Sequence, residues 1–435
     1  MLIYAPEISS RHKYIFSLLI TELLGLELKF STDKTEFINS AEPKINYSKE
    51  NFNSGLFVEA VDLLFEKDIR AQKINVTRGS GQMPRPTFFK TSSASAIPFD
   101  LFAAAFYLVS RYEEYLPFNA DEHGRYTAEE SLAFKNNFLD QPLVNQWAYL
   151  LRDKLKELYP SLVFKTPSYK YISTIDVDNV YAYRGKSFVR TTGAQIKDIF
   201  KFDLNKVSER SKVLSGKASD PFDRYAYHKE LKEKYKHDLI YFLLCTEPAA
   251  YDNAISPDRK EYQQLVKQLN GFAEVALHPS YSTPKNVNKL KDECQQLSGI
   301  SGKAISKSRQ HFLRFNLPDT YTNLIASQIR EDHSLGYTTQ TGFRAGICSP
   351  FYFYDLKKEE ATPLKIFPFA FMDFTLCEVL KLSPQQASEK IGSVISEVKK
   401  VNGTLISVWH DRTFSNRDIY KGWNEVYEKM LEKAI

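Results

Sequence analysis

Residues 171–179 read Y-I-S-T-I-D-V-D-N, and this stretch decides the fold of the second half of the chain. An apolar run with β-branched residues ends in two aspartates, Asp176 and Asp178, which is the pattern of a buried strand and its polar end. Side chains two residues apart on a strand share a face, so both carboxylates are expected on one side. Such a pair stays ionised only where a metal ion, an arginine or N–H groups compensate it. The stretch indicates a functional site, with an ordinary Asp-Asn turn as the alternative.

Beyond this stretch, strand-like and helical segments alternate to the end of the chain. The expected strands cover residues 171–175, 239–245, 274–277, 307–310, 364–371 and 403–408. The expected helices cover residues 225–235, 261–269, 285–296, 320–329, 384–398 and 423–433. Repeated strand–helix units build a parallel sheet, either open or closed into a barrel, so the fold class is α/β.

The first half of the chain alternates in the same way. Strands are expected at residues 2–5, 26–30 and 55–61, with helices at 11–24, from Pro98 onward, and at 144–158. A chain of 435 residues exceeds one ordinary core, and residues 161–169 read as a linker. We therefore expect a smaller α/β domain over 1–165 and a second domain over 166–435.

Two polar stretches of the first half are expected to lie at the surface. Arg111, Glu113 and Glu114 close the helix that begins near Pro98, where a solvated helix end is the common outcome. The segment D-E-H-G-R-Y holds His123 and reads as a loop, in which an isolated histidine is usually a surface residue.

Composition excludes several classes of function. The net charge is +5, but Lys and Arg form no cluster in the sequence, so no nucleic-acid partner is expected. No apolar run approaches the roughly 18 residues of a membrane span, and the start M-L-I-Y-A-P lacks the form of a signal peptide. The four cysteines are scattered, which argues against a disulfide framework and a zinc knuckle. A cytoplasmic protein is expected, and no sequence feature assigns its oligomeric state.

Chemically active residues stand at or just past the expected strand ends. They are Asp176, Asp178, His278, His311, Arg344, Asp373 and His410. In a β/α barrel the carboxyl ends of the strands meet at one mouth, where active sites are found. Any one of these residues alone is a weak signal, but their convergence indicates a functional site.

Aspartate and histidine together suit a divalent first-row metal, either zinc or a competitor such as cobalt, nickel or iron. Such an ion activates water, while a remaining aspartate takes a proton and a separate histidine gives one to the leaving group. The sequence has no G-x-S-x-G, no phosphate-binding glycine loop and no H-E-x-x-H. Metal-assisted hydrolysis of an amide or ester is the reaction that remains.

The ordered motifs T-I-D-V-D-N, H-P-S-Y-S, G-F-R-A-G, F-M-D and V-W-H resemble those of the polysaccharide deacetylases, carbohydrate esterase family four. The resemblance covers the chain from Lys170 onward and implies a distorted (β/α)7 barrel. The first half, with I-P-F-D-L-F-A-A-A-F-Y-L-V-S-R-Y-E-E-Y and D-E-H-G-R-Y, resembles the uncharacterised domain that precedes such barrels in Bacteroidetes proteins.

The resemblance also implies roles for individual residues. Asp176 would be the general base and Asp178 a metal ligand, although Val177 separates two aspartates that are adjacent in the family's usual motif. His278 would be the first metal histidine. Arg344 would hold the base, Asp373 would tune the acid, and His410 would be that acid. Val408 would line the pocket for the acetyl methyl group, with Trp409 and Tyr281 as further substrate contacts.

The second motif departs from the family, because Ser282 stands where a second metal histidine is usual. Catalytic zinc sites generally use three protein ligands, so another residue is needed. His311 is expected to fill this place, since it closes the strand after the one that carries His278. His333 is the alternative.

Two functions from different classes remain open at this point. The first is a metal-dependent deacetylase that acts on an N- or O-acetylated saccharide. The second is a catalytically weak or inactive barrel that binds carbohydrate. Asp176, Arg344 and His410 favour the enzyme, because a binding module needs no base and acid, whereas Ser282 favours the binding module. Hydrolysis of a small cyclic amide is a third, weaker reading.

Overall fold

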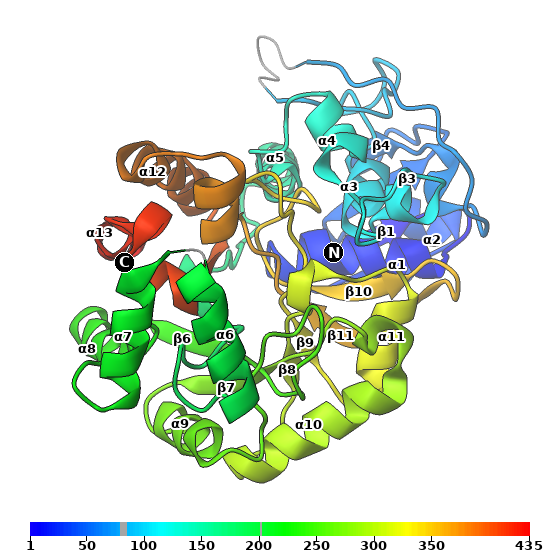
Figure 1. Cartoon of the computed structure of the whole chain (residues 1–435). Coiled ribbons are helices and arrows are strands. Elements are labelled where there is room, and N and C mark those ends of the chain that lie inside the picture. Colours follow the sequence, from blue (N-terminus) through cyan, green and yellow to red (C-terminus); the bar gives the residue numbers. More distant parts are fainter. Residues whose placement is uncertain (79–84, 201) are drawn as a thin grey trace.

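The computed structural model describes residues 1–78, 85–200 and 202–435 and contains two sheets (Figure 1). The first half forms a four-stranded parallel sheet in the order β2-β1-β3-β4. Its strands are β1 (Leu2–Tyr4), β2 (Lys29–Ser31), β3 (Lys44–Ser48) and β4 (Leu56–Glu59). Its α-helices are α1 (Ser10–Phe16), α2 (Lys34–Asn39), α3 (Leu101–Val109), α4 (Leu132–Lys135) and α5 (Leu143–Leu158).

The second half forms a nine-stranded sheet in the order β10-β11-β9-β8-β7-β6-β5-β13-β12. Its strands are β5 (Lys170–Val177), β6 (Asp238–Leu244), β7 (Glu274–His278), β8 (Lys307–Ser308), β9 (Glu331–Asp332), β10 (Phe351–Asp355), β11 (Glu360–Ile366), β12 (Phe371–Met372) and β13 (Thr404–His410). All neighbours pair in parallel except the antiparallel hairpin β10–β11.

Helices cover the outer side of this curved sheet, as Figure 1 shows for α8 to α11. The helices of this half are α6 (Phe188–Phe200), α7 (Leu204–Leu214), α8 (Tyr225–Tyr235), α9 (Lys260–Asn270), α10 (Val287–Ser301), α11 (Asp319–Ala326), α12 (Pro384–Lys400) and α13 (Trp423–Ala434). The start of α12 follows from local chemistry: the Ser383 and Gln386 side chains cap each other's backbone N–H groups, and Pro384 opens the first turn. None of the helices in the described ranges is both long and apolar enough to cross a membrane.

The distorted (β/α)7 barrel that the resemblance implies is not confirmed, because the described residues form no closed barrel. Among the described residues, the edge strands β10 and β12 do not pair with each other, so the sheet stays open. The expected strand over 364–371 is instead the end of β11, a break, and the two-residue β12. Residues 333–350 contain no strand, so the Arg344 segment adds nothing to the sheet. The chain returns through the β10–β11 hairpin, which occupies the edge beside β9.

The first half of the chain packs against that hairpin. The Arg11 guanidinium on α1 forms a two-pronged ion pair with Glu359, and the Tyr14 hydroxyl donates to the Tyr352 carbonyl at 2.6 Å. One hydrophobic core runs through both halves. All four cysteines are buried as free thiols. The division at residue 165 stays a prediction.

Alternation along the strands of the second sheet places the site residues. On β5, Tyr171, Ile175 and Val177 pack into the large core below the helices, while Ile172 packs into small clusters on the opposite face. Asp176 lies on that inner face, because it is separated from Ile172 by four residues. The inner faces of the central strands therefore lead directly to the polar strand ends.

Candidate metal centre

A cavity of about 330 Å³ lies at the carboxyl ends of the central strands. Five residues singled out in the sequence line it: Asp176, Asp178, His278, His311 and His410. In the register of β5 and β13, Asp176 lies directly opposite His410, and His278 ends β7. His311 stands three residues past β8, in a short turn. The convergence expected from the sequence is thus present, on an open sheet.

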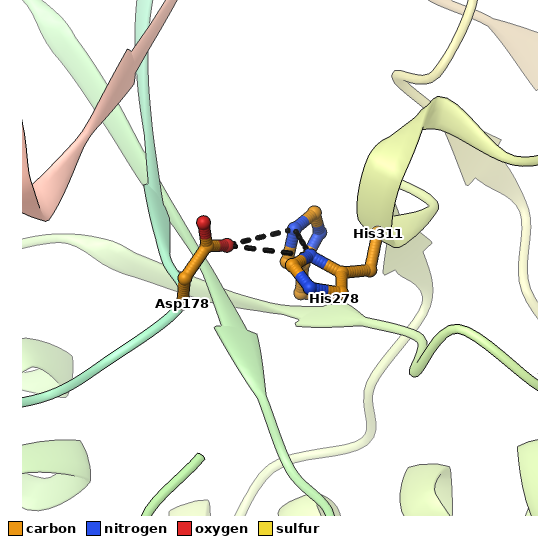
Figure 2. Close-up of side chains that lie close together, drawn as sticks. All are labelled: Asp178, His278 and His311. Atoms are coloured by element: carbon orange, nitrogen blue, oxygen red, sulfur yellow. Dashed lines mark hydrogen bonds and ion pairs between the residues drawn. The ribbon is translucent and has the colours of Figure 1, made fainter. Parts of the chain in front are cut away.

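Asp178, His278 and His311 form a compact cluster, in which the carboxylate faces both imidazoles (Figure 2). The Asp178 Oδ1 atom lies 3.3 Å from His278 Nε2 and 3.4 Å from His311 Nδ1. The two imidazole nitrogens lie 3.0 Å apart. Both histidines are buried.

Hydrogen bonds on the far sides of the rings set which nitrogen carries a proton. His278 Nδ1 lies 2.5 Å from the Arg309 carbonyl, and His311 Nε2 lies 3.1 Å from the Tyr251 carbonyl. A carbonyl only accepts, so these nitrogens are the donors. In neutral rings the remaining nitrogens carry lone pairs, and these point at each other and at a carboxylate. Three acceptors facing one point require a cation or a proton between them.

The donor set fits a metal ion. A tetrahedral zinc ion with bonds of about 2.0 to 2.1 Å separates its ligand atoms by about 3.3 Å, which matches the observed 3.0, 3.3 and 3.4 Å. Oδ1 of Asp178 is buried and accepts no hydrogen bond from any described residue. Its other oxygen, Oδ2, accepts from Arg412 Nη1 at 3.1 Å. Asp178 is thereby anchored at one oxygen and available at the other.

The charges in this cluster depend on one another. Burial by itself raises the pKa of a carboxyl group, yet His311 and His278 hold the pKa of Asp178 well below its usual value. Burial by itself lowers the pKa of an imidazole, yet Asp178 raises the pKa of His311. Both directions have the same cause, which is opposite charges in close contact away from water.

Asp176 lies beside the cluster and is held by Arg309. The Arg309 Nη1 atom donates to Asp176 Oδ1 and to Thr174 Oγ1, each at 2.7 Å, and Nε donates to the His333 carbonyl. Arg309 is fully buried, with its guanidinium 4.4 Å from the centre of the Phe242 ring. Removal from water strengthens this ion pair and fixes the Asp176 carboxylate.

His410, the neighbour of Asp176 on the adjacent strand β13, forms a second buried pair with Asp373. His410 Nδ1 lies 2.6 Å from Asp373 Oδ1, and Asp373 Oδ2 accepts the His410 backbone N–H at 2.7 Å. Burial by itself lowers the pKa of His410, but the Asp373 carboxylate outweighs it and raises the pKa to about 9. His410 therefore carries a proton at neutral pH.

The structure corrects the expected role of Arg344. Its guanidinium forms a bidentate pair with Glu114, with Nε to Oε1 at 2.9 Å and Nη2 to Oε2 at 2.7 Å. Arg309, not Arg344, contacts Asp176. The reason is that Arg344 lies on a loop rather than at a strand end, facing the first half of the chain. Arg111, Glu113 and Glu114, expected in solvent, are buried in the same ion cluster.

The three expected substrate contacts do not line the cavity. Val408 is buried beneath it, in a cluster with Leu313 and Met372. Trp409 points to the outer side of β13, where it packs against Trp423 and Tyr427, because neighbouring residues on a strand face opposite sides. Tyr281 lies beside the cavity, where it stacks on Tyr251. Their roles as substrate contacts stay untested, and Val408 and Trp409 would have to act through neighbours.

Two further expectations concern the third ligand. Ser282 is exposed, and its hydroxyl accepts from Lys289 at 3.1 Å, so this position does not face the cluster. His333 is buried against the Phe367 ring and lies outside the Asp178–His278–His311 group. The structure thus brings His311, and neither alternative position, to Asp178 and His278. Ligation by His311 stays a prediction.

Sequence reasoning missed three contributors to the site. Arg309 and Arg412 each lie two residues from a selected histidine, His311 and His410, and this spacing was an available signal. The third is the loop 121–125, from which Glu122, His123 and Arg125 line the cavity. No local pattern could place that loop here, because the contact joins segments nearly 200 residues apart.

Comparisons with known proteins give the following matches. Residues 1–160 match the model of a family of unknown function, DUF7033. No curated protein matches the chain. Among similar solved structures, a protein from Mycobacterium smegmatis assigned as a polysaccharide deacetylase is 13% identical, with 61% of this chain and 83% of that chain covered and a TM-score of 0.40. The Puue allantoinase is 10% identical, with 60% of this chain and 84% of that chain covered and a TM-score of 0.39. A mutant of a CE4 family pseudoenzyme with restored enzymatic activity is 10% identical, with 61% of this chain and 63% of that chain covered and a TM-score of 0.30. These sequence identities and TM-scores assign no function to this chain.

Proposed function

We propose that this protein is a metal-dependent hydrolase that removes acetyl groups from an N- or O-acetylated carbohydrate. One observation carries the proposal: two imidazole nitrogens and a carboxylate oxygen face one another at 3.0 to 3.4 Å on a cavity wall. The same cavity is also lined by Asp176 and His410, which are neighbours on the paired strands β5 and β13. A binding module would need neither of these two residues in its cavity.

Asp178, His278 and His311 would hold the ion, with zinc the best match and cobalt, nickel or iron as competitors. When bound, such an ion lowers the pKa of a coordinated water and polarises the scissile carbonyl. Three protein ligands leave a position open for water or substrate, which distinguishes catalytic from structural zinc sites.

Asp176 is assigned as the general base. It lines the cavity, and the buried Arg309 holds its Oδ1 atom in place. A base held in this way takes the proton from the attacking water without reorganising. Asp178 is the less suitable base, because one of its oxygens faces the two histidines and the other accepts from Arg412.

His410 is assigned as the general acid. Its Nδ1 atom is bound by Asp373, so Nε2 is the nitrogen available to a substrate. The Asp373 contact keeps His410 protonated at neutral pH, where it can give its proton to the departing amine or alcohol.

The test is acetate release from a panel of N- and O-acetylated saccharides by protein stripped with a chelator and then reloaded with zinc, cobalt, nickel or iron. We expect no release without metal and recovery after reloading, together with about one ion per chain by elemental analysis. Turnover that survives in a metal-free sample would exclude the metal mechanism. Saccharide binding without turnover in the loaded protein would support the binding-module alternative.

A further inference from the structure

The loop 121–125 reaches the metal cavity in a preset shape. The Asp121 carboxylate accepts the backbone N–H groups of His123 and Arg125, each at 2.9 Å, through Oδ1. Its Oδ2 atom accepts from Arg125 Nε at 2.7 Å. One aspartate thus fixes both the loop backbone and the Arg125 guanidinium. This loop belongs to the segment that matches a family of unknown function.

The turn that begins at His311 has a strained backbone conformation. Phe312 has a φ of 61° and Leu313 a φ of 50°, both in the left-handed region. The left-handed conformation is sterically disfavoured for residues other than glycine, and bulky side chains rarely adopt it. A turn with two of them in succession persists only where surrounding contacts over-determine it. Because His311 opens this turn, those contacts also set the direction of its imidazole.

The loop and the turn are joined by arginine hydrogen bonds, with one arginine donor on each segment. Arg125 Nη1 donates to the Phe312 carbonyl at 2.6 Å. In return, Arg314 Nε donates to the His123 carbonyl at 3.1 Å, and its Nη1 donates to the Tyr281 carbonyl at 2.7 Å. The His123 ring packs edge-on against the Phe312 ring, with centroids 5.0 Å apart. The Arg125 bond is charge-assisted and acts on the strained residue itself.

We propose that Arg125 is a positioning residue for the metal ligand His311, so that the first half of the chain is a working part of the metal centre. Arg125 acts by holding the Phe312 carbonyl, which keeps the left-handed turn and aims His311 Nδ1 at Asp178 and His278. The inference rests on the proposed metal site. It gives the loop 121–125 a task that an accessory domain would not have.

Zinc affinity of the full chain tests this, measured by competition with a chromophoric chelator. Arg125→Met is expected to weaken zinc binding about 10- to 100-fold, the usual effect of removing a residue that supports a metal ligand. Arg125→Lys should recover part of this loss, because it restores a charged donor. Arg152→Met, on the surface of α5, should bind zinc like the parent protein.

The sign of the effect separates positioning from simple electrostatics. Arg125 places a positive charge at the cavity, so Coulomb repulsion alone predicts tighter zinc binding in Arg125→Met. Cobalt-loaded protein adds a second readout, since the visible absorption of cobalt reports ligand geometry and should change in Arg125→Met. Unchanged or tighter zinc binding in this variant would overturn the proposal.

A double-mutant cycle with Phe312→Gly locates the action of Arg125 in the turn. Glycine adopts a left-handed φ without the steric penalty, so the turn needs less support. We expect Arg125→Met to weaken zinc binding much less in the Phe312→Gly protein than in the parent. The same loss in both backgrounds would show that Arg125 does not act through this turn.

Hydrogen exchange tests the turn even if the proposed function is wrong. The Leu313 and Arg314 amides donate to the Gln310 and His311 carbonyls at 2.9 and 3.2 Å. In metal-free protein these amides should exchange faster in Arg125→Met, and at the parent rate in Arg152→Met. If the parent chain binds no divalent metal, the proposed function fails, whereas unchanged exchange in Arg125→Met overturns the positioning role.

Discussion

Two of the buried clusters of charged side chains among the described residues differ in one respect. In the cluster formed by Arg111, Glu113, Glu114 and Arg344, two guanidiniums meet two carboxylates, and each carboxylate is paired. In the cluster formed by Asp178, His278 and His311, three acceptor atoms converge, and Oδ1 of Asp178 has no hydrogen-bond donor among the described residues. The first cluster is complete in itself, and the second is complete only with a cation or a proton between its acceptors.

The comparison shows which property of a buried polar cluster points to function. Burial and charge are common to both clusters. What distinguishes the cluster of Asp178, His278 and His311 is an excess of acceptors facing one point and a cavity beside it. The ion cluster instead joins the end of α3 to the loop that carries Arg344, so its task is structural.

The largest effect is expected from Asp176→Asn. This variant should lose about 10² to 10⁴-fold in kcat, the usual contribution of a general base, while zinc affinity stays near that of the parent. Acetate release and zinc content measured on the same sample check both parts. Loss of zinc in Asp176→Asn, with zinc retained in Asp178→Asn, would reverse the roles of the two aspartates.

Glu114→Ala should destabilise the fold without touching the metal. It leaves the buried Arg344 guanidinium without a carboxylate partner, while Arg111 keeps Glu113, and breaking a buried ion pair in this way typically costs about 3–5 kcal/mol. Urea unfolding measures this loss, and zinc affinity of the folded variant should not change. As a control, Glu157→Ala removes an exposed pair with Lys154 and should stay within about 0.5 kcal/mol. A loss of zinc affinity in Glu114→Ala would remove the distinction between the two clusters.

The His410–Asp373 pair should make stability depend on pH in a defined window. The pKa of His410 is raised to about 9, above the roughly 6.5 of an unfolded chain. The pair therefore stabilises fully below pH of about 6.5 and loses its effect as pH rises through about 9, by an amount on the order of 3 kcal/mol.

Unfolding free energies of the parent and of His410→Gln, measured from pH 6 to 10, check this window. The difference between the two proteins should shrink as pH rises. A constant difference over the whole range would show that His410 is not protonated in the fold.

The smallest effect is expected from substitutions of Arg309, which contacts Asp176, and of Arg344, which contacts Glu114. Arg309→Lys should lower kcat about 10- to 100-fold, the usual effect of removing an orienting partner, because lysine cannot reach Asp176 and Thr174 with the same planar group. Arg344→Lys should reduce stability and leave kcat near the parent value. Steady-state kinetics with urea unfolding on both variants decides the matter, and the opposite pattern would restore Arg344 as the partner of the base.

Local pattern predicted much of the second half of the chain. The helix expected at 225–235 has the same bounds as α8, and the expected helices near 261–269 and 384–398 match α9 and α12 within two residues. Strand ends carrying Asp176, His278 and His410 were predicted because the apolar run stops where the polar residue begins. Arg344 was misplaced, because its segment resembles a strand end and yet forms no strand.

The sequence by itself determined which residues stand at the strand ends and which face they share, because a strand's period of two is a local property of the backbone. Only the tertiary structure decided which charges pair. Arg309 pairs with Asp176 and Arg344 pairs with Glu114, and both choices depend on how distant segments pack. The same holds for the loop 121–125, which meets the turn at His311 only because the first half of the chain folds against the second. Contacts between segments so far apart are set by the packing of whole layers, which no local pattern encodes.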